Sequence, residues 1–326
     1  MHSRNDVALV AGGAGFIGSH LVDRLLASGA MVVCLDSFLT GTQANLAHLA
    51  HEPRFDLIEA DVIDALPPRL TRARLSQVWN LACPASPQHY QADPEHTMLT
   101  NVLGTRNLLR LAEAQSARFL LTSTSEVYGD PEVHPQGESY RGSSSCTGPR
   151  ACYDEGKRAA EALTFDYVRH GRVEARVARL FNTYGPRMRP DDGRVVSNVL
   201  AQALSGEDIT IYGDGMQTRS FCYVDDVIEG LFGLMNSDVA EGPVNLGNPH
   251  EITIKELVQR VVRLTESGSR IVTRPLPVDD PRRRRPDIGR ANAMLGWEPR
   301  ISLELGLQRT TAWLAADTGS ASSRAA

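Results

Sequence analysis

The chain has 326 residues, of which 42% are hydrophobic and 22% charged, and its formal net charge is -5. This length suits one large α/β domain, or one such domain with a smaller lobe built on it. The negative charge argues against nucleic-acid binding, because such proteins usually carry a basic domain. No apolar run reaches the roughly 18 residues of a membrane span, and strand-like sequence begins at Val7, so no membrane segment or signal peptide is predicted. We expect a soluble, cytoplasmic protein.

The cysteines are odd in number and show no C-x-x-C or metal-ligand spacing. They are Cys34, Cys83, Cys146, Cys152 and Cys222. Reduced thiols are the better interpretation of this pattern, so we predict no disulfide and no metal site.

A glycine-rich turn follows the first apolar run, Val7 to Ala11, and precedes leucines that recur at helical spacing. The turn reads GGAGFIG and contains two overlapping glycine triplets, which begin at Gly12 and Gly13 and both end at Gly18. Either triplet lets the backbone approach a diphosphate at the start of the helix. The alternative is a tight turn in some other α/β protein.

Asp36 ends the next strand, about 20 residues after the glycines. At this position a carboxylate can accept hydrogen bonds from an adenosine ribose. The same negative charge would repel a 2′-phosphate. The sequence therefore predicts NAD, rather than NADP, as the cofactor.

Strands and helices continue to alternate along the chain. Strand-like segments span residues 55–61, 78–82 and 118–124, and a helix is expected over about 93–114. Such alternation predicts a Rossmann-type, doubly wound parallel sheet with helices on both faces. We expect residues 1–190, with returning segments, to form the NAD-binding domain, 191–314 mostly a smaller substrate-binding lobe that includes the stretches ITIYG and GPVNLG, and 315–326 a frayed tail.

Polar side chains gather where the strand 118–124 ends and in the helix after it. The carboxyl ends of parallel strands line the ligand crevice of such a sheet, so Thr124 and Glu126 are placed to face a ligand. Tyr153 and Lys157 are four residues apart and share one helix face. A neighbouring ammonium and an oxidised nicotinamide would lower the pKa of a phenol from about 10, which makes Tyr153 a candidate general base. For this pair alone, a solvated helix face is the alternative.

The glycine loop, the stretch TSTSEVYG and the Tyr153/Lys157 pair resemble extended short-chain dehydrogenases/reductases that act on nucleotide sugars. A closer resemblance, to the UDP-glucuronate decarboxylases or UDP-xylose synthases, rests on the stretches LACPASP, GPRACYDEGKR, RLFNTYGPRM, DDGRVVSN and YGDGMQTRSFCYV. It extends from about Val7 to Thr311. Residues 143–147 differ from the more apolar, proline-containing segment that the resemblance leads us to expect. This difference affects the loop before Tyr153.

This resemblance implies a redox-neutral cycle with NAD as cofactor, UDP-glucuronate as substrate and UDP-xylose as product. Tyr153 would deprotonate the C4 hydroxyl, and the C4 ketone would make the C5 carboxylate a β-keto acid that loses carbon dioxide. Thr124 and Tyr153 would hydrogen-bond the ketone oxygen. Lys157 would hold the nicotinamide ribose, and Glu126 would lie against the sugar ring.

The resemblance also implies two sets of binding residues. The cofactor set comprises Gly12, Gly15, Phe16, Ile17, Gly18, Asp36, Asp61, Val62, Leu81, Ala82 and Asn101, together with Tyr153 and Lys157. The set for the UDP moiety comprises Asn182, Arg187, Val196, Tyr212, Gln217 and Arg219. Arginines suit diphosphate oxygens because guanidinium groups form bidentate hydrogen bonds. For a single aromatic or arginine in the lobe, packing or a surface charge is an equally good interpretation, except at Arg219.

Four consecutive arginines stand between two prolines in the stretch PRRRRP, residues 281–286. The prolines favour extended backbone, so Arg282 and Arg284 should point to one side and Arg283 and Arg285 to the other. In the resembled decarboxylases an arginine at the position of Arg284 lies beside the departing carboxylate. We expect Arg284 to hold that carboxylate, Arg282 to be a possible second contact, and Arg283 and Arg285 to be solvated. A solvated basic turn is the alternative.

Three other functions remain alternatives to decarboxylation. Two are enzymes that use the same NAD cycle, and the third binds NAD without catalysis. A 4,6-dehydratase is expected to carry an Asp-Glu pair after the threonine, where this chain has Ser125 and Glu126. A 4-epimerase needs no group for a departing carboxylate, and a non-catalytic NAD sensor needs no Thr124, Tyr153 and Lys157 together. The resemblance further implies a homodimer, formed through the helices over 93–114 and 150–170.

Overall fold

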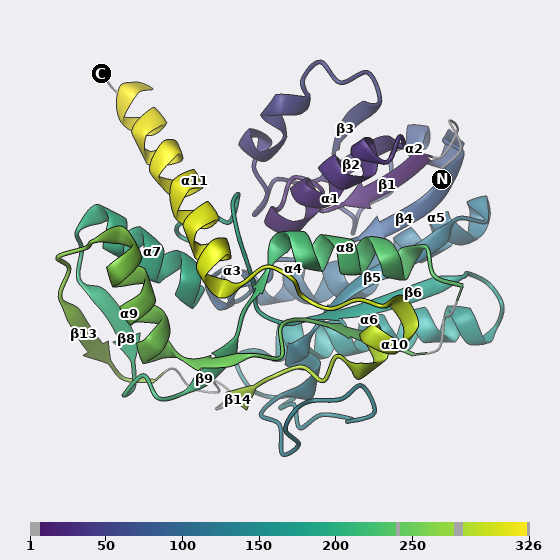
Figure 1. The fold of residues 1–326 in the computed structure, drawn as a ribbon. Coiled ribbons are helices and arrows are strands. Elements are labelled where there is room, and N and C mark those ends of the chain that lie inside the picture. Colours follow the sequence, from purple (N-terminus) through teal and green to yellow (C-terminus); the bar gives the residue numbers. More distant parts are fainter. Residues whose placement is uncertain (1–6, 239–241, 277–282, 325–326) are drawn as a thin grey trace.

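The computed structural model describes residues 7–238, 242–276 and 283–324. Its centre is a seven-stranded parallel sheet in the order β11-β6-β5-β4-β1-β2-β3 (Figure 1). The strands are β1 Val7–Ala11, β2 Met31–Asp36, β3 Phe55–Glu59, β4 Leu75–Asn80, β5 Arg118–Thr124, β6 Ala175–Leu180 and β11 Val244–Leu246. The order reverses between β1 and β4, which is the point where a doubly wound sheet opens a ligand crevice. The predicted Rossmann-type sheet is confirmed.

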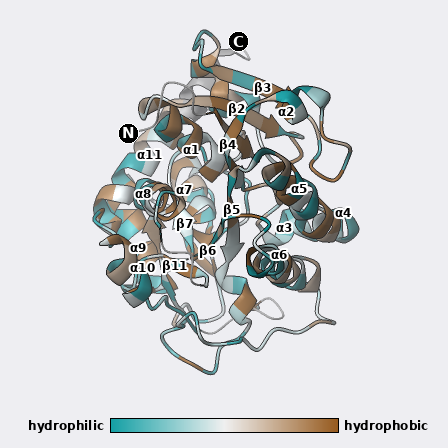
Figure 2. Ribbon diagram, turned by 90° about the vertical axis from the view of Figure 1, so that its right-hand side faces the viewer, coloured by the Kyte–Doolittle hydropathy of each residue, from teal (hydrophilic) through white to brown (hydrophobic). Residues whose placement is uncertain are grey.

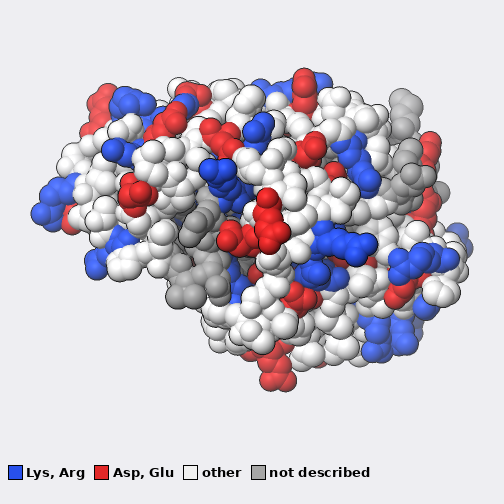
Figure 3. Space-filling model, turned by 90° about the horizontal axis from the view of Figure 1, so that it is seen from below, with Lys and Arg blue, Asp and Glu red and all other residues white. Residues whose placement is uncertain are grey.

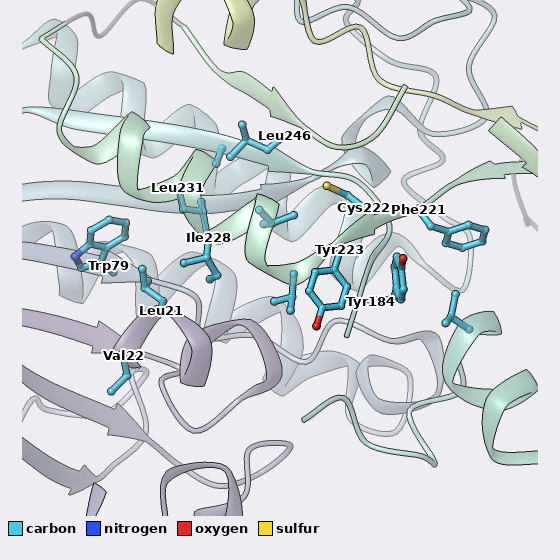
Figure 4. Close-up of a cluster of buried hydrophobic side chains, with 14 of the residues drawn as sticks. Leu21, Val22, Trp79, Tyr184, Phe221, Cys222, Tyr223, Ile228, Leu231 and Leu246 are labelled. Atoms are coloured by element: carbon cyan, nitrogen blue, oxygen red, sulfur yellow. The ribbon is translucent and has the colours of Figure 1, made fainter. Parts of the chain in front are cut away.

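Helices cover both faces of this sheet (Figure 2). One face carries α1 (Phe16–Ala27) and α8 (Val224–Met235), and the other carries α5 (Thr105–Gln115) and α6 (Ala151–Arg169). The central strand β1 is buried on both faces and reads as a continuous apolar run, VALVA, whereas the edge strand β3 has one buried residue and carries charged side chains. In Figure 4, leucine and isoleucine side chains of α1 and α8 pack together next to Trp79 of β4.

The helix expected over 93–114 is divided in three. It comprises α4 (Pro94–Leu99), a π-helical turn over Thr100–Gly104 and then α5. The side chain of Asp93 caps α4 by accepting a hydrogen bond from the backbone N–H of His96 at 3.0 Å. A π turn redirects the side chains that follow it, which a regular 3.6-residue periodicity does not predict.

Short helices and helical turns occupy several loops of the main domain. They are η1 Gln43–Leu49, α2 Pro68–Arg72, α3 Pro87–Tyr90 and η3 Ser125–Tyr128. Two of these loops, with α3 and η3, approach the carboxyl ends of the central strands, where the candidate site lies.

A smaller lobe stands to one side of the sheet (Figure 1). Its helices are α7 Val195–Ser205 and α9 Ile254–Thr265, and its strands are β8 Ile209–Tyr212, β9 Thr218–Ser220, β12 Glu251–Thr253, β13 Ile271–Arg274 and β14 Arg283–Arg284. Strand β9 lies between β12, which is antiparallel to it, and β14, which is parallel to it. A further parallel pair joins β7 (Thr183–Tyr184) to β10 (Cys222–Tyr223).

The expectation that the stretch GPVNLG belongs to the lobe is wrong. Residues Val244–Leu246 form β11, which pairs with β6 at the edge of the main sheet. Three residues are too few to reveal which sheet they join, because that depends on the packing of α8 before them rather than on their own pattern.

The C-terminal segment crosses back over the main domain as α10 (Gly289–Leu295) and ends in α11 (Leu303–Arg324). Asp226 of α8 anchors it twice: the indole Nε1–H of Trp297 donates to the Asp226 carbonyl at 2.8 Å, and the Ile301 N–H donates to its carboxylate at 2.9 Å. The tail expected to be frayed from residue 315 continues α11 as far as Arg324.

Basic and acidic side chains are interspersed on the face of the molecule seen in Figure 3. Over the described ranges of the chain, no helix is both long and apolar enough to cross a membrane. Within the same ranges no group of three or more His, Cys, Asp or Glu side chains could hold a metal ion. All five cysteines are free thiols, of which Cys34 and Cys222 are buried and Cys146 is exposed.

Candidate active site

A cavity of about 710 Å³ opens between the carboxyl ends of the central strands and the lobe. The five residues predicted to be catalytic all line it: Thr124, Glu126, Tyr153, Lys157 and Arg284. So do the six residues predicted to bind UDP: Asn182, Arg187, Val196, Tyr212, Gln217 and Arg219. A second cavity of about 70 Å³ adjoins the first and is lined by Asp36, Asp61, Val62, Leu81 and Ala82. The predicted residues thus come together, although they are spread over most of the chain.

The glycine loop closes tightly against its surroundings. Gly12 has a φ of +79°, and a Cβ atom there would lie 2.7 Å from the backbone of Leu81. A Cβ atom on Gly18 would lie 2.0 Å from the carbonyl oxygen of Gly12. At the start of α1, Gly15 provides no side-chain cap for the free backbone N–H groups. An uncapped helix start against a cavity fits the diphosphate of a dinucleotide.

Asp36 stands at the end of β2, where it lines the smaller cavity. Its two carboxylate oxygens accept hydrogen bonds from the backbone N–H groups of Ala14 and Phe38, each at 2.9 Å. Burial raises its pKa, and these hydrogen bonds oppose that change only in part. The carboxylate is therefore fixed in place, with lone pairs left for a ribose hydroxyl.

Asp61 contributes a second carboxylate to the smaller cavity. One oxygen accepts from the backbone N–H of Ile63 at 3.0 Å, and the other lies 2.8 Å from Nε2 of His96. His96 also lines this cavity and was not predicted from the sequence. Its contact with Asp61 spans 35 residues, which no local pattern reveals.

Tyr153 lies in the first turn of α6, with its ring stacked on that of Tyr90 at 4.9 Å between ring centroids. Burial raises the pKa of Tyr153 well above its ordinary value, and only the hydrogen bond with Thr124 and the charge of Arg194 oppose this. Lys157 was expected to lower the pKa of Tyr153 as well, but within the chain alone it is not among the groups that do so. The Lys157 ammonium lies 6.0 Å from the ring centroid and donates to the Thr122 carbonyl at 2.9 Å.

Burial also lowers the pKa of Lys157, so it disfavours the ammonium form on which the prediction relied. An oxidised nicotinamide next to the phenol would supply the missing positive charge. A basic Tyr153 is thus expected only with the cofactor in place.

Glu126 and Arg284 form a buried, bidentate ion pair, with both N–O distances at 2.7 Å. Burial by itself would raise the pKa of Glu126, but the guanidinium groups of Arg284 and Arg150 outweigh it and hold this pKa below its ordinary value. Strand β14 brings Arg284 to this position, because it pairs with β9 and sets Arg284 beside Arg219.

The sequence did not predict two neighbours of the catalytic group: Arg150, which lines the large cavity, and Tyr90, which lines neither cavity. Arg150 lies 3.6 Å from Glu126 and donates from Nε to the hydroxyl of Tyr90 at 2.8 Å. Tyr90 is in turn buried under Tyr153. Arg150 stands one helical turn before Tyr153, a spacing that puts the two side chains on one face and could have indicated it.

The arginine run alternates as predicted where the structure describes it. Arg284 is buried and faces the cavity, whereas Arg283 is exposed. Arg285 is half-buried rather than solvated, because its backbone exchanges two hydrogen bonds with Gln136, at 2.8 and 2.9 Å. Arg282 lies outside the described residues, so its expected second contact stays a prediction.

Asn101 does not line either cavity. It lies behind them, where its amide donates to the Thr97 carbonyl at 3.0 Å and to the sulfur of Cys83 at 3.2 Å. It packs against Gly156 of α6, where a Cβ atom would lie 3.0 Å from it. The π turn sets this position, where Asn101 supports Cys83 and α6 instead of lining a cavity with the other predicted cofactor-binding residues.

Three features meet at the two adjoining cavities: a glycine loop at the start of a helix, an acidic residue at the end of a strand, and a Tyr–Lys pair on one helix. Together they define a nucleotide-dependent enzyme of the short-chain dehydrogenase/reductase type. The chain belongs to the NAD dependent epimerase/dehydratase family, whose model matches residues 8–247.

Curated relatives and solved structures resemble nearly the whole chain. It is 54% identical over 301 residues to UDP-glucuronic acid decarboxylase 1 of Arabidopsis thaliana, a match that covers 92% of this chain and 68%, about two thirds, of the relative. It is 52% identical over 302 residues to UDP-glucuronic acid decarboxylase 1 of Danio rerio, covering 93% and 71%. The UDP-glucuronic acid 4-epimerase of Bacillus cereus, solved with UDP-glucuronic acid and NAD, has a TM-score of 0.86 at 27% identity and covers 95% and 99%.

Proposed function

We propose that the protein converts UDP-glucuronate to UDP-xylose and carbon dioxide through a UDP-4-keto intermediate, with NAD bound throughout. The observation that carries this proposal is the position of Arg284, a buried guanidinium that lines the cavity together with Thr124 and Tyr153. A fixed positive charge next to the reacting hydroxyl suits a substrate with a carboxylate at C5. The names of the curated relatives support the same reaction.

When bound, NAD supplies a two-electron acceptor for the C4 hydride, which returns to C4 at the end of the cycle. Tyr153 accepts the proton of the C4 hydroxyl as the ketone forms. The C5 carboxylate is then β to a ketone, and carbon dioxide leaves while the electron pair moves onto the ketone oxygen. Thr124 and the protonated Tyr153 hydrogen-bond that oxygen as its negative charge develops.

The charges around Glu126 are suited to this sequence of steps. Arg284 and Arg150 already lower the pKa of Glu126, and Arg219 contributes in the same direction. This excess of guanidinium groups leaves positive charge for a second carboxylate, that of the substrate. Once carbon dioxide has left, a proton from solvent takes its place at C5, and the same positive charge assists its delivery. The ketone finally regains its C4 hydrogen, and Tyr153 returns the hydroxyl proton.

The proposal extends to the remaining predictions from the sequence. The residues of the glycine loop and the smaller cavity would hold NAD, and the lobe residues would hold UDP. We also propose a homodimer through the segment 93–114, which contains α4 and α5, and through α6, as the resemblance implies. We further propose a division into residues 1–190 and 191–314, with α8 and β11 as returning segments. A cytoplasmic location, and the lack of nucleic-acid or membrane partners, stay predictions from the composition.

The test is to incubate the purified protein with UDP-glucuronate and follow carbon dioxide release together with the NMR spectrum of the sugar. Carbon dioxide and UDP-xylose are the expected products. Carbon dioxide with a stable 4-keto pentose means that hydride return fails. UDP-galacturonate without carbon dioxide would make the protein a 4-epimerase, and no product at all would make it a nucleotide sensor.

A further inference from the structure

A short turn after β7 brings Arg187 to the edge of the large cavity. The backbone of Arg187 has a φ of +67°, a left-handed conformation that costs a non-glycine residue on the order of 1 kcal/mol. This cost is offset by contacts that fix the residue. Nη2 of Arg187 lies 2.7 Å from a carboxylate oxygen of Asp23 on α1.

Asp23 is itself held on its other side. Its second carboxylate oxygen lies 2.7 Å from Nε2 of His48, at the end of the η1 turn. One carboxylate therefore joins a helix, a loop and the turn that carries Arg187. Three residues before Asp23 on α1, the ring of His20 contacts the Pro186 carbonyl oxygen at 3.0 Å. Because a carbonyl oxygen can only accept, Nε2 of His20 donates this hydrogen bond, and burial lowers the pKa of His20.

The second terminal nitrogen of the Arg187 guanidinium, Nη1, has no comparable contact in the described part of the chain. Nη1 is buried and has no hydrogen-bond partner among the residues that the structure describes. A buried, unpartnered N–H group on a cation is costly, and an anionic oxygen is the partner that best removes this cost. Arg187 lines the cavity together with Gly15 and Phe16, at the start of the helix that carries Asp23.

We propose that Asp23 is a positioning residue, which holds Arg187 so that its guanidinium binds a diphosphate in the large cavity. This inference rests on the proposed nucleotide-binding role of that cavity and adds a residue outside it. Asp23 lines neither cavity, and its effect on binding passes through Arg187. Both the cofactor and the nucleotide sugar contain a diphosphate, and their binding is measured separately.

The experiment is calorimetric titration of the nucleotide-free protein with NAD and, independently, with UDP. We expect Asp23→Asn to weaken the binding of one of them by roughly tenfold, the effect of losing one charge-assisted contact. Arg187→Ala should weaken the same ligand at least as much. The double variant should bind like Arg187→Ala alone, because Asp23 has nothing left to position. Loss for NAD assigns Arg187 to the cofactor, and loss for UDP assigns it to the nucleotide sugar.

Two further variants separate positioning from a purely structural role. Asp23→Glu keeps the negative charge and should recover most of the lost affinity. Asp208→Asn removes a different Asp–Arg ion pair, with Arg270 at an exposed position away from both cavities, and should leave both affinities unchanged.

Unchanged affinities for NAD and UDP in folded Asp23→Asn protein would overturn the inference. So would a loss that is just as large in the Arg187→Ala background. Because the readout is binding, a wild-type protein that binds NAD without releasing carbon dioxide contradicts the proposed function alone.

Discussion

Arg284 is the residue whose removal separates the proposed reaction from simple nucleotide binding. Arg284→Ala is expected to lower carbon dioxide release by on the order of a hundredfold or more, as found when one preorganised charge-stabilising group is lost. Arg283→Ala is the matched control, because Arg283 is the exposed neighbour of the same strand, and it should stay within a few-fold of wild type. Circular dichroism verifies folding. A folded Arg284→Ala enzyme with near-normal turnover would return the arginine run to a structural role.

The Glu126–Arg284 pair also predicts a pH dependence of stability. In the wild type the pKa of Glu126 is depressed, so its contribution to stability is present above about pH 4, the unfolded value, and is lost as the pH falls through the folded value. Without Arg284 the burial of Glu126 raises this pKa. The variant should therefore lose stability relative to wild type as the pH rises, reaching about 3 kcal/mol at pH 7.

Urea unfolding at pH 4 and pH 7 measures this difference for Arg284→Ala and Arg283→Ala. The free-energy difference from wild type should grow with pH for the first variant only. An equal difference at both pH values would mean that the ion pair does not control the charge of Glu126.

Asp36 is predicted to set the choice of cofactor. Its carboxylate is fixed by two backbone N–H groups at the edge of the smaller cavity, so it should bind a free ribose 2′-hydroxyl and repel a 2′-phosphate. We expect NAD to bind at least tenfold more tightly than NADP, and Asp36→Ala to narrow this ratio. Titration with both nucleotides checks it, and equal affinities in the wild type would contradict the assignment.

At the scale of elements, the turn between β1 and α1 tolerates no added atom. Gly18→Ala would place a Cβ atom 2.0 Å from the Gly12 carbonyl oxygen, so the loop must shift and the affinity for NAD should fall by more than tenfold. Gly233→Ala is the same change within α8, where nothing lies within 4 Å of the new atom. It should raise the free energy of unfolding by about 0.5–1 kcal/mol and leave NAD binding unchanged. NAD titration and urea unfolding report both effects.

The helices and strands also show which parts of the fold and of the site could be predicted from local sequence patterns. Local periodicity was enough for α1, α6 and β5, and therefore for the placement of the glycine loop, Thr124, Tyr153 and Lys157, because each depends only on residues a few positions away. It was not enough for the π turn before α5, where one inserted residue moves Asn101 behind the cavity. Nor could it predict that Arg150 contacts Tyr90, because this hydrogen bond joins the short helix α3 to the start of α6, 60 residues later.

For the whole molecule, we expect a homodimer in which the segment 93–114, with α4 and α5, and the helix α6 pair with their counterparts. These helices lie together on one side of the sheet, so a single surface carries them (Figure 2). Light scattering at micromolar concentration should give twice the mass of the chain. A monomer mass under these conditions would refute the pairing.

The ion pair between Glu126 and Arg284 joins positions that are 158 residues apart in the chain. The glycine loop and Asp36 belong to the first few dozen residues, so the segments proposed to bind the diphosphate and the adenosine ribose leave the ribosome long before β14 does. During synthesis, the Glu126 carboxylate therefore has no Arg284 guanidinium to pair with until β14 has been made. The part of the site proposed for the adenosine and diphosphate of NAD can therefore form early. The proposed chemistry at C5 is possible only once Arg284 has emerged, because contacts of long sequence separation form late.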